Sequence, residues 1–120
     1  MLRRLFMPLV AALLVSTSNV FAQDSRVVLI NTFEVPAAQE AEVLHIWTKS
    51  KEFLEKQPGY ITTRLHKNID PNGKFRFINV AEWVSPQHFQ AASKAMNEST
   101  VPKMPEAVRF SPGLFKVVAQ

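Results

Sequence analysis

The sequence predicts an α+β fold in which the elements follow the order βαββαβ. Three observations support this prediction. Apolar residues recur every three or four positions in two segments, which is the spacing of an amphipathic helix. Four other segments are rich in β-branched and aromatic residues, and some alternate polar with apolar positions, as strands do. Between the second and third of these strands, a Pro and a Gly stand where a tight turn needs them.

The first strand and the first helix are predicted on either side of Pro36. Residues 26–35 are mostly β-branched and apolar, so they are expected to form a strand that ends before this proline. Residues 37–56 are expected to form a long amphipathic helix, which stops at Pro58 and Gly59. Its apolar positions are Val43, Ile46, Trp47, Phe53 and Leu54.

A β-hairpin is the expected structure of the middle of the chain. Residues 60–69 alternate, with Ile61, Thr63 and Leu65 on the side opposite to Tyr60. The turn Asp70-Pro71-Asn72-Gly73 should fold this strand back, antiparallel, onto a third strand at residues 74–84.

The second helix is predicted from its own start signal. Ser85 offers a hydroxyl as N-cap, and Pro86 suits the first helical position. The segment 97–112 contains three prolines and is expected to be irregular. Residues 113–119 are expected to close the chain as the fourth strand.

This order of elements is that of the ferredoxin-like fold, an antiparallel four-stranded sheet with both helices on one face. The first strand carries Val27, Leu29 and Phe33 on one side, and Val28 and Ile30 on the other. Both faces of the sheet are therefore partly apolar, and the helices cover only one of them. We expect a second copy of the chain to cover the other, as a homodimer.

The first 22 residues are expected to be a signal peptide that lies outside the fold. Arg3 and Arg4 precede an apolar run at residues 5–15, which is shorter than the roughly twenty residues that cross a bilayer. Small residues before the junction predict cleavage after Ala22. We expect a periplasmic or secreted protein without a stable membrane anchor, exported by either the general secretory or the twin-arginine route.

Composition excludes several classes of function. The 120 residues include no Cys, which excludes a disulfide scaffold, a thiolate metal site and a Cys nucleophile. The formal charge of +4 falls to +2 when Arg3 and Arg4 are removed with the signal peptide, which argues against a nucleic-acid partner. Residues 23–120 are expected to form a single domain with its core over about 27–119.

Two asparagines stand in apolar rows of the predicted strands. Asn79 shares its side of the third strand with Phe77, Ala81 and Trp83, and Asn31 interrupts the row of Val27, Leu29 and Phe33 in the first. An unpartnered amide there costs about 1 to 3 kcal/mol. Two such amides and the Trp83 indole could orient a planar, oxygenated, mostly apolar ligand. The alternative, hydrogen bonding within the core, is the commoner fate of such amides.

Other candidate residues are less specific. His66 is the best candidate for a general base, although a half-exposed structural histidine is the commoner case. Arg64 could bind an anion or an enolate, but an arginine paired with Glu82 or Glu34 explains it equally well. Phe33 and Phe77 could contact an aromatic substrate. Trp47 is most simply a core residue. The spacing of the three histidines gives no metal-site pattern, so no metal is expected.

Five stretches of the chain resemble the antibiotic biosynthesis monooxygenase family of dimeric α+β barrel proteins. They are Val28-Leu29-Ile30-Asn31-Thr32-Phe33, Trp47, Gln57-Pro58-Gly59-Tyr60, Leu65-His66-Lys67-Asn68-Ile69-Asp70 and Phe77-Ile78-Asn79-Val80-Ala81-Glu82-Trp83-Val84-Ser85.

The resemblance implies an oxidation by molecular oxygen that needs no cofactor. Asn31, Asn79 and Trp83 match the positions with which anthrone oxidases of the family hold a polyphenol, and the amides would stabilise the enolate oxygen. Haem-degrading members instead carry a tryptophan and a haem-ligating histidine farther along the second helix. Here residues 91–97 contain neither. Haem binding and a non-catalytic binding or stress protein remain the alternatives.

Overall fold

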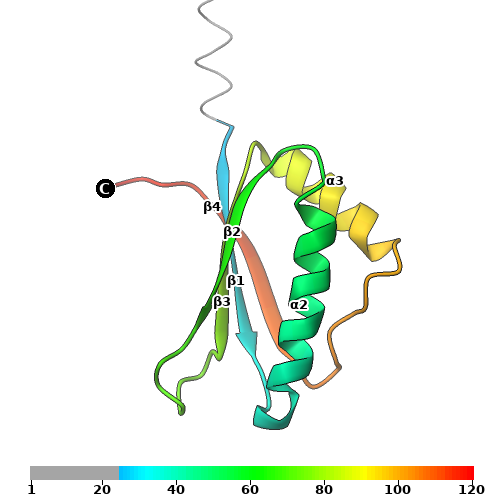
Figure 1. Ribbon diagram of the computed structural model, residues 1–120. Coiled ribbons are helices and arrows are strands. Elements are labelled where there is room, and N and C mark those ends of the chain that lie inside the picture. The colour runs from blue at the N-terminus through cyan, green and yellow to red at the C-terminus, as the bar shows by residue number, and fades with distance from the viewer. Residues whose placement is uncertain (1–24) are drawn as a thin grey trace, which may run out of the picture.

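The computed structural model describes residues 25–120, which form one antiparallel sheet with two helices on one of its faces (Figure 1). The predicted signal peptide and its cleavage point lie outside these residues. The helices are α2 (Glu40–Leu54), preceded by the short 3-10 turn η2 (Ala37–Gln39), and α3 (Pro86–Asn97). The strands are β1 (Val27–Glu34), β2 (Tyr60–Lys67), β3 (Phe77–Trp83) and β4 (Arg109–Phe115).

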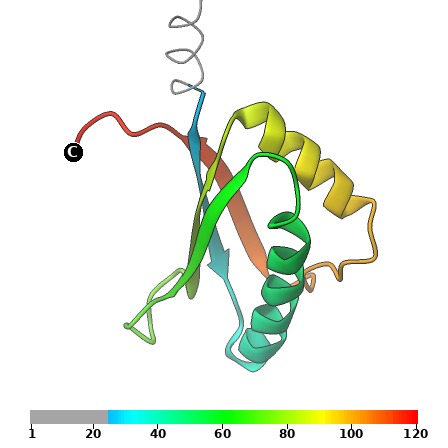
Figure 2. The same ribbon diagram turned by 45° about the horizontal axis from the view of Figure 1, so that its top comes forward.

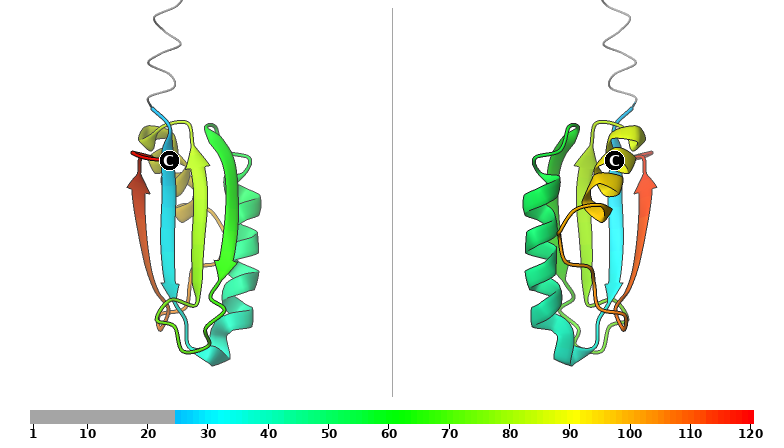
Figure 3. Two further views of the ribbon diagram at one scale, coloured as in Figure 1. Left: turned by 90° about the vertical axis from the view of Figure 1, so that its left-hand side faces the viewer. Right: turned by 90° about the vertical axis from the view of Figure 1, so that its right-hand side faces the viewer.

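The strands lie side by side in the order β2-β3-β1-β4, with every neighbouring pair antiparallel (Figure 3). This is the arrangement of the ferredoxin-like fold, so the predicted fold class is confirmed. β1 and β3 are the central strands and pair directly with each other, from Val27 with Trp83 to Phe33 with Phe77.

The predicted turn and helix cap are both present. The amide of Gly73 donates to the carbonyl of Asp70 over 3.1 Å, which closes the four-residue turn. The hydroxyl of Ser85 accepts from the backbone amide of His88 over 3.2 Å, and Pro86 is the first residue of α3. Both local sequence signals are therefore confirmed.

The predicted fourth strand is wrong in position. β4 runs over Arg109–Phe115 and includes Pro112, which the sequence placed in an irregular segment. β4 pairs only with β1 and is an edge strand, and an edge strand tolerates a residue that cannot donate a backbone hydrogen bond. The irregular connection from α3 to β4 is accordingly shorter, at residues 98–108.

The hairpin also differs from its prediction. β3 begins at Phe77 rather than Lys74, so the loop spans residues 68–76. A β-bulge lies between Tyr60 and Thr62. The extra residue brings Tyr60 to the same face as Trp83, whereas strict alternation had placed it opposite Thr63. The two rings pack edge to face at 5.6 Å.

The core between sheet and helices consists of two separate clusters. One contains Val27, Leu29, Ala81, Trp83 and Ala92, and the other contains Phe33, Val43, Phe77 and Val108. Between them, at the middle of the central strands, stand Asn31 and Asn79, which are register partners. The apolar core is thus interrupted by a polar layer.

The other face of the sheet is not covered by any helix (Figure 3). Val28, Ile30, Ile78 and Val80 lie on this open face and are only partly buried. The chain after β4 runs out on the same side, with Val118 94% exposed (Figure 1). No helix within residues 25–120 has the length and apolar character of a membrane span.

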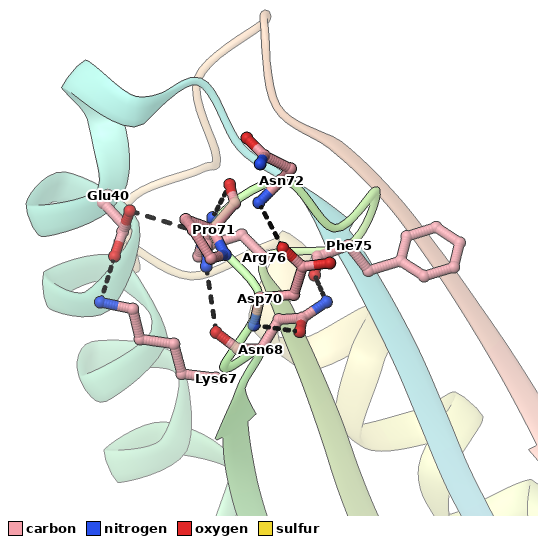
Figure 4. Close-up of polar contacts among 8 residues, drawn as sticks. All are labelled: Glu40, Lys67, Asn68, Asp70, Pro71, Asn72, Phe75 and Arg76. Atoms are coloured by element: carbon pink, nitrogen blue, oxygen red, sulfur yellow. Dashed lines mark hydrogen bonds and ion pairs between the residues drawn. The ribbon is translucent and has the colours of Figure 1, made fainter.

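The start of α2 is joined to the hairpin loop by an ionic network around Glu40 (Figure 4). Its carboxylate lies 2.6 Å from Lys67 Nζ and 3.6 Å from Arg76 Nε. The Arg76 guanidinium also donates to the carbonyls of Asn68 and Pro71, over 3.1 Å and 2.7 Å. The hydrogen bond from Lys67 is the main reason why the pKa of Glu40 is lowered. One arginine therefore stabilises the loop and links it to the helix.

Because the pKa of Glu40 is lower in the folded chain, its contribution to stability is present above its ordinary value of 4.5 and is lost as the pH falls through the lowered pKa. We predict that Glu40→Gln lowers the melting temperature at pH 7 and that the difference from wild type closes toward pH 3. Thermal unfolding at both pH values measures this. The control is Glu42→Gln, because Glu42 is exposed and has no ion pair within residues 25–120. A difference that persists at pH 3 would contradict the ionic role.

Candidate functional site

A cavity of about 310 Å³ lies between the helix-covered face of the sheet and the two helices, at the level of the polar layer. The connection at residues 98–108 runs on the same side of the sheet and contributes part of the wall (Figure 2). Most of the lining is apolar. The lining residues are Leu29, Asn31, Phe33, Ile46, Trp47, Ser50, Leu54, Asn79, Phe89, Ser93, Met96, Asn97, Val101, Pro102, Lys103, Met104, Phe110 and Pro112.

Asn31 and Asn79 lie opposite each other on β1 and β3, and both line this cavity. Directly opposed residues of an antiparallel pair have their Cβ atoms about 4.5–5.5 Å apart, so the two amides are neighbours. The register of the central strands therefore creates a pair of adjacent amides in an apolar wall.

The two amides differ in how they are held. Asn79 is 8% exposed, and its Oδ1 accepts two hydrogen bonds, from Thr63 Oγ1 over 2.8 Å and from Trp47 Nε1 over 3.3 Å. The Oδ1 of Asn31 is buried and has no hydrogen-bond partner within residues 25–120. Asn79 is thus held by its neighbours, whereas Asn31 carries an unsatisfied polar atom, which destabilises the fold.

Ionisable groups are scarce at this cavity. Of the side chains that line it, only Lys103 carries a charge, and its ammonium donates to the carbonyl of Asn97 over 3.0 Å. No group of three histidines or carboxylates within residues 25–120 is arranged to hold a metal ion. The polar groups of this mostly apolar site are therefore neutral apart from Lys103.

Two of the residues predicted for the site lie in the core clusters instead. Trp83 is 1% exposed and packs edge to face against Tyr60 and Phe89, and it does not line the cavity. Phe77 is fully buried in the other cluster and is likewise absent from the lining. Phe33 does line the cavity. The residues predicted to share one side of each strand do so, but only the middle of these rows reaches the cavity.

Arg64 and His66 are not at the cavity either. Both are exposed on the opposite face of the sheet, because alternate residues of β2 point to opposite sides and Thr63 and Leu65 face the helices. The ring Nδ1 of His66 lies 3.3 Å from the carbonyl of Ile78. Arg64 forms no ion pair with another described residue, so the alternative interpretation as an ion-paired arginine is not supported.

Trp47 and Thr63 are site residues that the sequence did not reveal as such. Trp47 follows the buried Ile46 on α2, and its helical periodicity indicated only a core position. Thr63 belongs to an alternating strand in which nothing marks one threonine above another. A search for the hydrogen-bond partners of Asn79 in an apolar row could have suggested them, but only the fold brings these elements together.

The fold and the site together define an α+β protein with a ferredoxin-like sheet and an amide pair in an apolar cavity. The model of the antibiotic biosynthesis monooxygenase family matches residues 26–97, which is more than half of the chain. The protein belongs to this family. No curated protein matches the chain.

Solved structures agree with this assignment. A candidate monooxygenase from Shewanella loihica PV-4 is 33% identical, with a TM-score of 0.73 over 80% of this chain and 97% of that one. SnoaB, a cofactor-independent oxygenase from Streptomyces nogalater, is 20% identical, with a TM-score of 0.59 over 80% and 96%. The haem degrader MhuD from Mycobacterium tuberculosis is 27% identical, with a TM-score of 0.60 over 78% and 97%. Similar structures therefore include proteins of more than one chemistry.

The different surroundings of the two asparagines predict opposite effects on stability. We expect Asn31→Leu to raise the free energy of unfolding by about 1 kcal/mol, because it removes a buried oxygen without a partner. We expect Asn79→Leu to lower it by about 2 kcal/mol, because it breaks two hydrogen bonds and leaves the Trp47 indole unpaired. Urea unfolding of both variants measures this. Destabilisation by both substitutions would show that Asn31 is satisfied in solution.

Proposed function

We propose that this protein is a cofactor-independent monooxygenase that oxidises a small, oxygenated aromatic compound, such as a quinol or a polyphenol, with molecular oxygen. The observation that carries the proposal is the pair of adjacent amides, Asn31 and Asn79, in the wall of an otherwise apolar cavity. Membership of the family and the oxygenase activity of SnoaB support the same class of reaction.

The proposed chemistry uses electrons from the substrate itself. A methylene group beside an aromatic ketone loses a proton and forms an enolate, whose oxygen the amide N–H groups stabilise. The enolate transfers electrons to oxygen and the methylene becomes a second carbonyl, so one oxygen atom enters the product. The other oxygen atom leaves as water, together with the two protons that the methylene has lost. The substrate thus supplies every electron that reduces the oxygen, and no external reductant is needed.

The side chains at the cavity match this chemistry. Asn79 is oriented by two hydrogen bonds, so it is a preorganised donor for the enolate oxygen. Aromatic side chains from the sheet, Phe33 and Phe110, provide apolar contact for a ring. Lys103 is the ionisable side chain in the lining, and its positive charge would favour the enolate over the neutral ketone.

The lining residues do not fit a haem group. Haem iron is held by a histidine, a cysteine thiolate or a tyrosine, with methionine as a partner ligand in some cytochromes. The lining contains no histidine or tyrosine, and the chain contains no cysteine. Met96 and Met104 are the sulfur groups present in it. We therefore propose no step through haem, although MhuD shares the fold.

We further propose that the protein is exported and acts as a homodimer outside the cytoplasm. The proposal for export depends on the signal-peptide pattern at residues 1–22. The proposal for a homodimer is supported by the open face of the sheet, whose central positions Ile30 and Val80 are register partners and apolar. The chain after β4, which contains the exposed Val117 and Val118, runs out on the same side (Figure 1).

The decisive assay is oxygen consumption by metal-free protein comprising residues 23–120 with a panel of quinols, anthrones and catechols. We predict turnover without added cofactor, with one atom of labelled oxygen in the product. Asn79→Ala should lower kcat about 100-fold, because it removes a preorganised donor. Activity and melting temperature are measured together, so that loss of the fold is recognised. The control is Asn72→Ala, whose side chain lies in the hairpin turn (Figure 4).

Other outcomes of this assay would favour the alternatives. If panel compounds bind but none is oxidised, the protein is a non-catalytic binding protein of the same fold. If hemin, added as a further ligand, gives a stoichiometric Soret band, haem binding replaces the oxygenase proposal.

The homodimer is tested by a charge on the open face. We predict that the wild type sediments as a dimer and that Ile30→Glu sediments as a folded monomer, because Ile30 points away from the core and its burial depends on a partner. Ile69→Glu is the matched control, because Ile69 is fully exposed on the hairpin loop. A monomeric wild type at micromolar concentration would contradict the proposal.

A further inference from the structure

We propose that Thr63 and Trp47 are positioning residues that fix the side-chain amide of Asn79 in one of its two orientations. In this orientation the carbonyl oxygen is held by protein and the N–H₂ group is left for the ligand. The site would therefore select ligands that present an acceptor oxygen, such as a carbonyl, phenolate or enolate. This inference rests on the proposed function and specifies its substrate class.

The argument begins with the chemistry of the donors. An indole nitrogen can only donate a hydrogen bond, so the Asn79 atom that faces Trp47 Nε1 at 3.3 Å must be the carbonyl oxygen. If the amide were rotated by half a turn, two N–H donors would face each other. The indole donor therefore determines which of the two Asn79 atoms, Oδ1 or Nδ2, faces Trp47.

Thr63 adds a second hydrogen bond to the same oxygen. Thr63 pairs with Ala81 in the sheet, so it is a diagonal neighbour of Asn79 on the helix-covered face. Its hydroxyl lies 2.8 Å from Asn79 Oδ1. A hydroxyl can donate or accept a hydrogen bond. Because the indole fixes Asn79 Oδ1 as the atom next to the Thr63 hydroxyl, Thr63 is the donor. Residues from α2, β2 and β3 therefore hold one amide.

The consequence concerns the nitrogen of Asn79. Both lone pairs of its carbonyl oxygen are engaged, and no hydrogen bond from its Nδ2 to another described residue is present. The two N–H groups of Asn79 Nδ2 therefore remain available to donate hydrogen bonds to a ligand in the cavity. Because the amide is already oriented, binding an acceptor oxygen requires no reorientation.

Asn31 provides the contrast within the same site. Its Oδ1 has no partner within residues 25–120, so nothing comparable fixes its orientation. Of the two amides, only Asn79 is preorganised by other side chains. We therefore assign the discrimination for an acceptor oxygen to Asn79, together with Thr63 and Trp47.

The test compares two ligands that differ in one carbonyl oxygen, 6-hydroxy-1-tetralone and 5,6,7,8-tetrahydro-2-naphthol, by isothermal titration calorimetry. We expect Thr63→Val to weaken binding of the ketone about threefold, because the Trp47 indole still favours the same orientation, and binding of the naphthol less than twofold. The melting temperature should fall by a few degrees, because one hydrogen bond to the buried Asn79 is lost. Thr63→Ser keeps a hydroxyl and should restore the preference. Trp47→Phe, which keeps a ring but removes the donor that determines the orientation, should weaken binding of the ketone about tenfold.

Thr48→Val is the matched control, because the hydroxyl of Thr48 is exposed and bonds within its own helix to the carbonyl of Leu44. Equal weakening of both ligands by Thr63→Val, or a Thr63→Ser variant that behaves like it, would overturn the inference.

A second measurement tests the orientation without any ligand. In the ligand-free protein, the side-chain N–H₂ resonances of Asn79 should shift in Thr63→Val and keep their wild-type positions in Thr63→Ser and Thr48→Val. Unchanged resonances in Thr63→Val would overturn the inference. If neither ligand binds the wild type while the resonances behave as expected, the proposed substrate class fails and the positioning role stands.

Discussion

The site of this protein depends on the register of the two central strands, which places Asn31 opposite Asn79. Apolar partners flank this pair on both sides, Leu29 with Ala81 and Phe33 with Phe77, and they belong to the two separate core clusters. A shift of the register by one residue would send every one of these side chains to the other face of the sheet. The burial of the apolar partners therefore keeps the two amides at the wall of the cavity, and the stability of the core maintains the geometry of the site.

The site combines rigidity with few charges. Asn79 is held by side chains from a helix and an edge strand, and the lining is otherwise mostly apolar, with Lys103 as its ionisable group. In such surroundings, an oriented amide interacts more strongly with a developing negative charge than it would in water. The unsatisfied oxygen of Asn31 lowers the stability of the fold. Buried polar groups without a partner are characteristic of binding and catalytic sites. Similar structures share this fold. A fold does not fix a function, so the ligand and the chemistry depend on the residues that line the site.

Much of the fold was predictable because its signals are local. The turn at residues 70–73, the cap at Ser85 and the helical spacing of residues 37–56 are each encoded within a few positions. The predictions were wrong where the structure depends on pairing between strands that are distant in the sequence. Pro112 belongs to β4 because that strand lies at the edge of the sheet, and Tyr60 joins the helix-covered face because of a bulge. Neither the edge position nor the bulge has a signal within the strand itself.

By itself, the sequence determined the order of elements and the two amides in apolar rows, because alternation and helical spacing assign each residue to a face of its own element. It also contained the stretches that resemble the family. The tertiary structure decided which residues of a face share a cavity. It placed Trp83 and Phe77 in the core, and Arg64 and His66 on the opposite face of the sheet. It also brought Trp47 and Thr63 onto Asn79, from 32 and 16 positions away in the chain. Such contacts depend on how helices and strands pack against one another, and the period of a single element contains no information about that packing.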